Sequence, residues 1–191
     1  MMGTAWLRRA VLPGCIVWVA TVGLPKCVAT ARTPTQYEVE AAYLVRFTEF
    51  LRFPPEIRSA PSLDICVWGE DPLERALKNL HDSEAASRQP IRTRSTQTVK
   101  DLQGCAIVYV SDSERAQMEQ DLKLLEGKDL LTVSGIPGFL EHGGMIQFLL
   151  EQDHVRFAIN MNAVNRTRIA VSSELIKVAR NVVGGPKGST P

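Results

Sequence analysis

Histidine side chains offer the most direct route to acid–base chemistry in this sequence. There are three of them, His81, His142 and His154, and each falls in a stretch that we expect to be a loop. His142 follows Glu141, which is the nearest approach to an acid–base pair. Neighbouring loop residues do not by themselves form an active site. We therefore predict no catalytic residue, and a weak hydrolase that uses His142 is a less favoured alternative.

Motifs for metals, phosphates and nucleophiles also give little support to an enzyme. His142 and His154 could share a cation by spacing alone, while Glu70 and Asp71 fit the start of a helix better than a cation site. The chain has neither Gly-x-Gly-x-x-Gly nor Gly-Lys-Ser/Thr, and it has no Gly-x-Ser-x-Gly. We predict no metal site and no cofactor.

The cysteines are better explained as structural residues. Cys15 and Cys27 lie in an N-terminal segment that we expect to be removed, which leaves Cys66 and Cys105. An even pair in an oxidising compartment favours a disulfide, and the alternative is two buried thiols. The bond would close a loop of about forty residues and add roughly 3–4 kcal/mol of stability in the chain-entropy model.

Residues 1–31 carry the features of a signal peptide. Arg8 and Arg9 precede a nearly continuous apolar stretch at 10–22, and the segment ends in a small-x-small pattern, so we expect cleavage after Ala31. An uncleaved membrane anchor is the alternative. The apolar stretch has about thirteen residues, however, whereas a membrane span needs roughly twenty. We therefore predict export to the periplasm, with no membrane span after cleavage.

The composition is typical of a soluble globular protein with one domain, here residues 32–191. The chain has 191 residues, of which 45% are hydrophobic and 23% are charged. Its formal charge is +1, but removing the three basic groups of residues 1–31 leaves 19 basic against 21 acidic residues. The sequence shows no basic stripe and no basic–aromatic interleaving, so we predict no nucleic-acid partner.

Apolar strands alternate with amphipathic helices, which indicates an α/β fold. A first helix is expected at 36–53, with Thr35 and Glu38 forming a capping box. Its expected apolar face consists of Val39, Ala42, Tyr43, Phe47, Phe50 and Leu51. Strands are then expected at 63–69, 90–96, 105–110 and 129–133, with helices at 72–80 and 113–125. This order predicts a single Rossmann-like three-layer domain with a mostly parallel central sheet.

The C-terminal part is predicted to be a β-hairpin followed by a terminal helix. In order, the expected elements are strands at 145–150 and 155–159, a short helix or turn at 162–167 and an edge strand at 169–171. The residues at 152–154 are polar and compatible with a turn, which favours a hairpin. Ser172 or Ser173 would cap the last helix, whose inward residues run to Val183.

A binding surface is easier to support than an active site. Phe139 and Leu140 lie in a loop punctuated by glycines. If these side chains are exposed, they form the kind of apolar anchor that contributes most interface energy; the alternative is that they belong to the core. We expect the loop at 139–146 and the C-terminal helix to form one face. The candidate partner-binding residues are Phe139, Leu140, Glu141, His142, Met145 and Arg156.

A series of landmarks occurs in a characteristic order along the chain. They are Ala-Ala-Tyr-Leu-Val-Arg-Phe-Thr-Glu-Phe at 41–50, Pro54-Pro55, Gly69-Glu70-Asp71-Pro72, the strand opened by Cys105, Leu131-Thr132-Val133, Arg156-Phe157-Ala158-Ile159-Asn160 and Val171-Ser172-Ser173-Glu174-Leu175. Over about residues 36–183, this ordered series resembles the YfiR family of exported bacterial proteins.

The resemblance implies a periplasmic α/β domain with a Rossmann-like core and no known catalysis. The best-known members of this family restrain an inner-membrane diguanylate cyclase by binding its periplasmic sensor region, and so lower cyclic di-GMP output. Cys66 and Cys105 match positions that form a disulfide in such proteins. The family pattern often has Asn where Gln147 stands and Glu where Ala158 stands. Ala158 would thus remove a charge from the outward side of the hairpin.

Sequence and resemblance together predict a periplasmic regulatory protein that is not an enzyme. Its partner would be the periplasmic domain of a membrane protein, with a diguanylate cyclase as the leading candidate, and a homodimer is a further option. Binding would stabilise the inactive state of the partner. The alternative from another class is a periplasmic protein that binds a small ligand in a cleft at the carboxyl ends of the strands.

Overall fold

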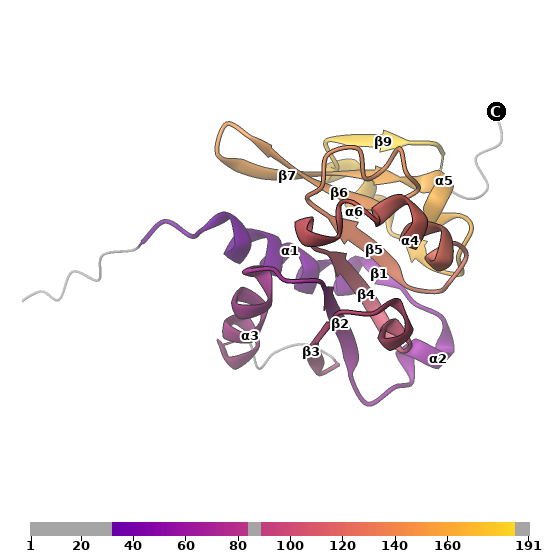
Figure 1. The fold of residues 1–191 in the computed structure, drawn as a ribbon, viewed down its shortest axis with the longest axis horizontal. Coiled ribbons are helices and arrows are strands. Elements are labelled where there is room, and N and C mark those ends of the chain that lie inside the picture. The colour runs from indigo at the N-terminus through magenta and orange to yellow at the C-terminus, as the bar shows by residue number, and fades with distance from the viewer. Residues whose placement is uncertain (1–31, 84–88, 186–191) are drawn as a thin grey trace, which may run out of the picture. The chain divides into compact units, whose positions relative to one another are not determined.

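A mixed sheet with helices on both faces forms the domain in the computed structural model, which describes residues 32–83 and 89–185. The predicted signal peptide lies outside the described residues. The sheet has the strand order β3-β2-β4-β5-β6-β7-β9 (Figure 1). Its strands are β2 (Leu63–Trp68), β3 (Ile91–Thr96), β4 (Cys105–Val110), β5 (Leu131–Ser134), β6 (Ile146–Glu151), β7 (His154–Asn160) and β9 (Asn181–Val183).

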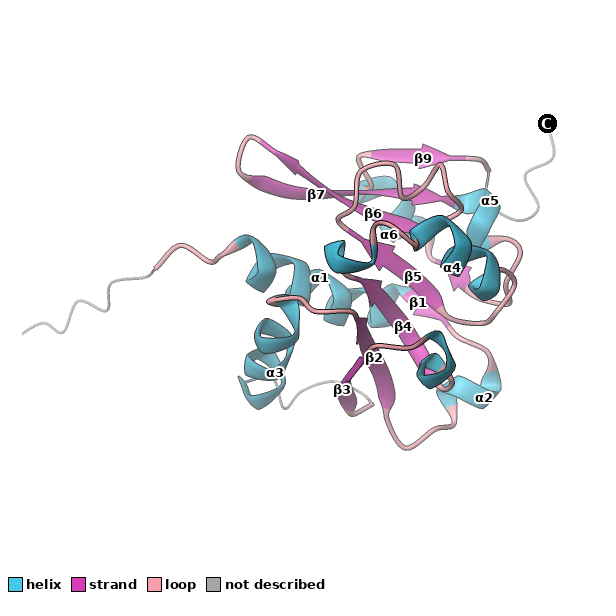
Figure 2. Cartoon of the chain, viewed as in Figure 1, coloured by secondary structure: helices cyan, strands magenta, loops and turns pink. Residues whose placement is uncertain are grey.

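The helices and the remaining short strands surround this sheet (Figure 2). The α-helices are α1 (Gln36–Phe50), α2 (Pro55–Arg58), α3 (Leu73–Ser83), α4 (Met118–Leu125), α5 (Met161–Val164) and α6 (Ser173–Val178). Two 3-10 helices, η1 (Val99–Leu102) and η2 (Asp112–Glu114), adjoin β4. A separate two-stranded sheet pairs β1 (Leu51–Arg52) with β8 (Ala170–Val171).

Most strand pairs are parallel, as the sequence predicts. From β3 through β2, β4 and β5 to β6, all neighbours are parallel. The hairpin partner β7 is antiparallel to β6, and β9 then pairs with β7 in parallel. The chain moves to one side of β2 to form β3 and returns to the other side to form β4. Such a reversal of strand order is where open α/β sheets usually bind ligands, at the carboxyl ends of the strands.

Two hydrophobic clusters, one on each face of the sheet, make the three layers. On one face, Ile65 and Val67 of β2 belong to a cluster with buried residues of α1, α3, α5 and α6. On the other face, Cys66 and Trp68 belong to a cluster with η1, α4 and the loop after β5. The alternation of side chains along a strand explains why neighbouring residues of β2 lie in different clusters. The single three-layer α/β domain is confirmed.

The first helix begins where predicted but ends earlier and buries a different face. Both hydrogen bonds of the Thr35–Glu38 capping box are present. The helix stops at Phe50, because Leu51 and Arg52 instead pair with β8 ahead of two prolines. Its fully buried residues are Glu40, Ala41, Leu44 and Phe47, while Val39, Tyr43 and Phe50 pack only partly against the core. The predicted face was therefore rotated, because a buried Glu cannot be distinguished from a surface Glu by periodicity.

The terminal helix is shorter than predicted, and the edge strand of the sheet lies after it. The Ser172 side chain caps α6, as expected, but the helix ends at Val178, whose side chain is exposed. Residues Asn181–Val183 form β9, because the outer edge of β7 offers free backbone groups and β-branched valines favour a strand. The predicted edge strand at 169–171 pairs with β1 and not with the main sheet.

The middle helices also differ at their ends. α3 continues to Ser83, so His81 lies in a helix and not in a loop, and residues 84–88 lie outside the description. The helix predicted to start at Ser113 instead begins at Met118, after the 3-10 helix η2. Its predicted core residues Met118, Leu122 and Leu125 are all buried. In the described residues, none of the helices is both long and apolar enough to cross a bilayer.

Candidate functional site

The β6–β7 hairpin carries the most projecting part of the sheet, and its tip extends past the neighbouring helices (Figure 1). Its strands pair continuously from Ile146 with Ile159 to Glu151 with His154. The turn consists of Gln152 and Asp153, both with positive φ, +48° and +62°. This is the pattern of a two-residue turn whose twist matches that of the strands. The hairpin was predicted correctly, except that His154 begins β7 and is not part of the turn.

Aromatic side chains fasten one side of this hairpin to α1. The rings of Tyr43 and Phe47 lie 5.5 Å and 5.2 Å from the ring of Phe157, centroid to centroid, in edge-on geometry. Phe47 also stacks on Phe148 at 6.1 Å. The Tyr43 hydroxyl donates a hydrogen bond to the carbonyl of Val155 at 3.4 Å. This side of the hairpin is therefore occupied, which leaves for a partner the tip and the exposed part of the opposite side around Arg156.

The loop between β5 and β6 places both predicted anchor residues, Phe139 and Leu140, in the core. Phe139 is 0% exposed and Leu140 is 8% exposed, in the cluster shared with α4. A Cβ at Gly144 would overlap the Phe139 ring, so only glycine permits this packing. The side-chain amide of Asn160 donates to the Leu140 carbonyl at 3.0 Å. Phe139 and Leu140 therefore do not form an exposed apolar anchor, and Met145 is buried as well.

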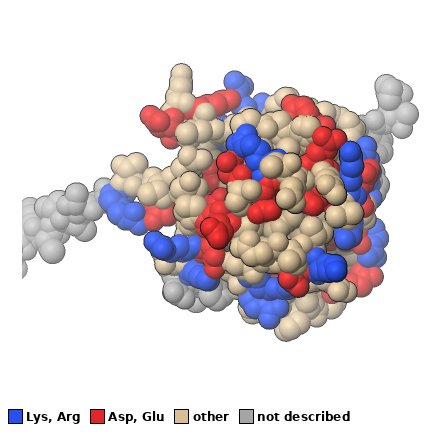
Figure 3. Space-filling model, in the orientation of Figure 1, with Lys and Arg blue, Asp and Glu red and all other residues tan. Residues whose placement is uncertain are grey.

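The polar members of the candidate surface do reach solvent. Glu141, His142 and Arg156 are all exposed. His142 Nδ1 lies 3.5 Å from Glu119 Oε2 of α4. Arg156 has no ion-pair partner in the part of the chain that the structure describes. The visible face of the molecule carries acidic and basic side chains interspersed with one another (Figure 3).

The loop and the terminal helix lie on opposite faces of the sheet, contrary to the expectation of one shared face. Phe139 and Leu140 belong to the cluster beneath α4, whereas Leu175 of α6 belongs to the cluster beneath α1. Ala158 is also not on an outward side: it is 4% exposed and packs in the α4 cluster. A periodic pattern shows that a strand has two faces, but it does not show which loop covers each of them.

The carboxyl ends of the strands carry acidic and hydroxyl groups. The turns after β2 and β4 are joined there, since the Glu70 amide donates to Ser113 Oγ at 3.1 Å. Asp71 caps α3 by accepting from the Leu73 amide at 2.9 Å, as predicted. Burial raises the pKa of Asp71, and the charge of Asp112 adds to the rise. Extra negative charge is therefore unfavourable at this end, which does not suit a phosphate.

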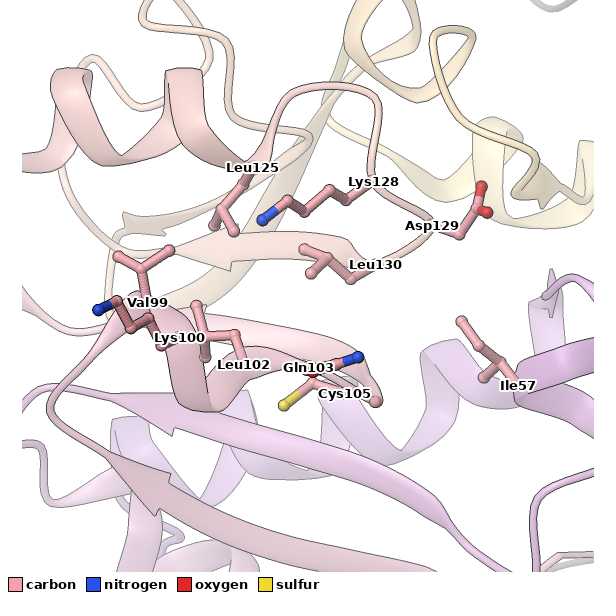
Figure 4. Close-up of a pocket in the computed structure, with 11 residues that line it drawn as sticks. Ile57, Val99, Lys100, Leu102, Gln103, Cys105, Leu125, Lys128, Asp129 and Leu130 are labelled. Atoms are coloured by element: carbon pink, nitrogen blue, oxygen red, sulfur yellow. The ribbon is translucent and has the colours of Figure 1, made fainter.

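A cavity of about 410 Å³ lies at the opposite end of the sheet, beside the amino ends of β4 and β5 (Figure 4). Its apolar walls come from α2, η1, β4, α4 and the loop before β5, and consist of Ile57, Val99, Leu102, Cys105, Leu125 and Leu130. Lys100, Gln103, Gly104, Lys128 and Asp129 complete the lining. This cavity cannot be predicted from the sequence, because residues from η1, α2 and the loop after α4 meet only in the folded chain.

Cys66 and Cys105 are joined by a disulfide, with their Cα atoms 5.9 Å apart. The bond links the adjacent parallel strands β2 and β4 beneath the α4 layer. Both half-cystines are buried, and Cys105 also contributes to the wall of the cavity. Among the described residues there is no group of three His, Cys, Asp or Glu side chains that could hold a metal ion.

Two buried carboxylates are structural features that the sequence analysis missed. Asp64 of β2 accepts hydrogen bonds from Arg92 and Arg94 of β3. Glu40 of α1 accepts from Gln36 at 2.7 Å and from the Tyr109 hydroxyl at 3.3 Å. The ion pairs of Asp64 can be inferred once β2 and β3 are paired in register, because Asp64 then stands opposite Arg92. The burial of Glu40 can be recognised only in the tertiary structure.

Comparison with known proteins gives one family and one shared fold. Residues 37–180 match the family model described as YfiR/HmsC-like. No curated protein matches the chain. A crystal structure described as a conserved domain protein from Vibrio cholerae is similar, with a TM-score of 0.50 at 9% sequence identity. The match covers 78% of this chain and 60% of that one, and at this identity it shows the fold alone.

Proposed function

This chain belongs to the YfiR/HmsC-like family, and on that basis we propose that it is an exported regulator that binds the periplasmic part of a membrane-bound signalling protein. The match over residues 37–180 is the observation that carries the proposal, since it spans nearly the whole described domain. The resembling YfiR proteins restrain diguanylate cyclases, so the partner is a cyclase of this kind. The protein acts by binding, and it lowers cyclic di-GMP output.

The contact surface consists of the exposed side of the hairpin and the adjacent loop. Arg156, Glu141 and His142 supply charge and hydrogen-bonding groups on this side. Leu150, which is 57% exposed near the tip, lies on the α1 side of the hairpin and supplies apolar area only there. Phe139, Leu140 and Met145 support this surface from the core and do not touch the partner. Arg156 is the residue of greatest interest, because a guanidinium without an internal partner is free to pair with a carboxylate of the partner.

Inhibition follows if the regulator binds the inactive conformation of its partner more tightly than the active one. A tenfold preference shifts that equilibrium by about 1.4 kcal/mol. The aromatic packing of Phe148 and Phe157 on α1 holds the hairpin rigid before the encounter. A rigid contact surface loses less conformational entropy on binding.

Co-purification from membranes tests the proposal. The wild-type protein should retain a membrane signalling protein, and its deletion from the host should raise cyclic di-GMP. Arg156→Glu should lower the amount retained about tenfold or more, because it places a like charge against the partner. Arg58→Glu is the matched control, since Arg58 is exposed at the end of α2 and lies outside the proposed surface.

Recovery of no signalling protein by the wild type would contradict the proposed function. Equal retention by Arg156→Glu and the wild type would reject the hairpin as the contact surface. A purified protein that converts a substrate without any partner would reject the view that it acts by binding.

A further inference from the structure

The cavity at the amino ends of β4 and β5 has an apolar interior and a positively charged end. Leu102, Leu125 and Leu130 are buried and face the space between η1 and the loop after α4. In Figure 4, the Lys128 side chain runs back toward Leu125 and Val99, while Ile57 lies at the far end of the lining. The Lys100 side chain extends past Val99, and the Lys128 nitrogen ends beside Leu125, so both lie on the side of the lining away from Ile57 (Figure 4).

The two lysines are the unpaired charges of this lining. Neither Lys100 nor Lys128 has an ion-pair partner within residues 32–83 and 89–185, and both are exposed. Asp129 is already neutralised, because its carboxylate accepts hydrogen bonds from the backbone and the guanidinium of Arg168 at 2.9 Å and 2.8 Å. Its carboxylate also points away from the cavity (Figure 4). The lining therefore presents net positive charge at one end.

We propose that this cavity binds a medium-chain aliphatic carboxylate, with the carboxylate between Lys100 and Lys128 and the alkyl chain directed toward Ile57. The volume of about 410 Å³ falls in the usual range for small-molecule sites. Burying the chain among leucine side chains removes apolar surface from water, which favours an alkyl body over a polar one. The proposal concerns a ligand of the isolated domain and does not depend on the membrane partner.

The charge pattern separates this ligand from its neutral and cationic analogues. A carboxylate would gain charge-assisted hydrogen bonds from the two ammonium groups. An alcohol of the same length keeps the apolar contacts but loses the charge, so it should bind more weakly. An alkylammonium ion would meet two like charges and should bind most weakly of the three.

Isothermal titration of the purified protein with decanoate, decan-1-ol and decylammonium tests the proposal. We expect decanoate to bind most tightly. The double substitution Lys100→Ala and Lys128→Ala should weaken decanoate binding about tenfold, or about 1.4 kcal/mol, and leave decan-1-ol unchanged. Lys123→Ala with Lys177→Ala makes the same change in net charge at exposed positions outside the lining, and should leave decanoate binding unchanged.

A third variant tests the location. Val99→Phe adds bulk to a half-buried wall residue and should abolish binding of both decanoate and decan-1-ol, with an unfolding curve that establishes that the variant is folded. The proposal is overturned if the wild type does not bind decanoate at about 1 mM, a concentration that still detects weak ligands. Equal weakening by the two lysine pairs, or unchanged binding by folded Val99→Phe, would also overturn it.

Discussion

Glu40 of α1 accepts a hydrogen bond from the Tyr109 hydroxyl of β4 at 3.3 Å, with both side chains buried in the core between helix and sheet. Only 1% of Glu40 is exposed. Burial raises its pKa above the ordinary value of 4.5, and the hydrogen bonds from Gln36 and Tyr109 offset the rise in part. Burial and the nearby Glu40 carboxylate also raise the pKa of Tyr109. The pair ties the first helix to the central strand at an electrostatic cost that depends on pH.

Glu40→Gln should therefore gain stability relative to the wild type as the pH rises. Folded Glu40 holds its proton more tightly than the unfolded chain does, so the wild-type free energy of unfolding falls between pH 4.5 and the raised pKa. Glutamine does not titrate, so the variant lacks this pH-dependent loss of stability. Each tenfold difference in proton affinity adds about 1.4 kcal/mol to the gap between the two proteins. Urea unfolding from about pH 4 to about pH 8 measures the gap.

The change of that gap with pH is the test, because any loss of packing on substitution shifts the stability of the variant by an amount that is nearly independent of pH. Glu141→Gln, at an exposed loop position, is the control and should leave the pH profile unaltered. A Glu40→Gln curve that stays parallel to the wild-type curve throughout would show that burial does not perturb this carboxyl.

Asp64 binds two arginines across the β2–β3 pair, and the three side chains should contribute unequally to stability. Its Oδ2 lies 2.5 Å from Arg92 Nη2 and 3.1 Å from Arg94 Nη1. Asp64→Asn should lower the free energy of unfolding by about 1–3 kcal/mol, because a buried ionic acceptor is lost. Arg92→Ala should cost less than about 1 kcal/mol, since Arg92 is mostly exposed and Arg94 still serves the carboxylate.

The pH dependence of this site has the opposite sign to that of Glu40. Burial would raise the pKa of Asp64, but the hydrogen bonds from Arg92, Arg94 and Ser62 outweigh it and lower the pKa below 3.8. The carboxylate thus stabilises the fold above that pH and ceases to do so as the pH falls through the lowered pKa. The advantage of the wild type over Asp64→Asn should shrink in acid. If Arg92→Ala lowered the free energy of unfolding more than Asp64→Asn does, Arg92 and not Asp64 would be the larger contributor to stability at this site.

Removing the Cys66–Cys105 disulfide should cost about 3–4 kcal/mol in the free energy of unfolding, because the bond restricts a loop with a sequence separation of 39. The double variant Cys66→Ala and Cys105→Ala tests this with little change in volume. Dithiothreitol should lower the stability of the wild type to that of the variant and leave the variant unaffected. Thiol titration of the unfolded, unreduced wild type should find neither thiol free, and two titratable thiols would contradict the bond.

The parts of the fold that could be predicted from sequence are those encoded locally. The Thr35–Glu38 capping box, the Asp71 and Ser172 caps and the apolar run of β4 depend on neighbours within a few residues, and each is present. The hairpin could be found because two strands joined by two residues pair with each other. These local signals were enough to define the α/β class.

The parts that could not be predicted depend on tertiary neighbours. Val182 and Val183 fit the inward face of a helix as well as they fit a strand, and the free edge of β7 decides between the two. Phe139 is buried because Gly144 lets its ring approach the backbone, and this contact is not visible in the sequence pattern. The cavity likewise joins residues as distant as Ile57 and Leu130. Burial, which residue type does not reveal, therefore decides which side chains of the predicted surface are available to a partner.

The turn at Gln152 and Asp153 leads to a final prediction, which separates the stability of the hairpin from its role in binding. Both residues have positive φ, where a glycine avoids the strain of a side chain. Asp153→Gly should raise the free energy of unfolding by about 0.5–1 kcal/mol. Gln97→Gly, at an exposed site with negative φ, should lower it instead. Urea unfolding distinguishes these results, and a loss of stability in Asp153→Gly would mean that the turn is not strained. Because Asp153→Gly leaves Arg156 in place, it should retain the membrane partner as well as the wild type does in the same co-purification.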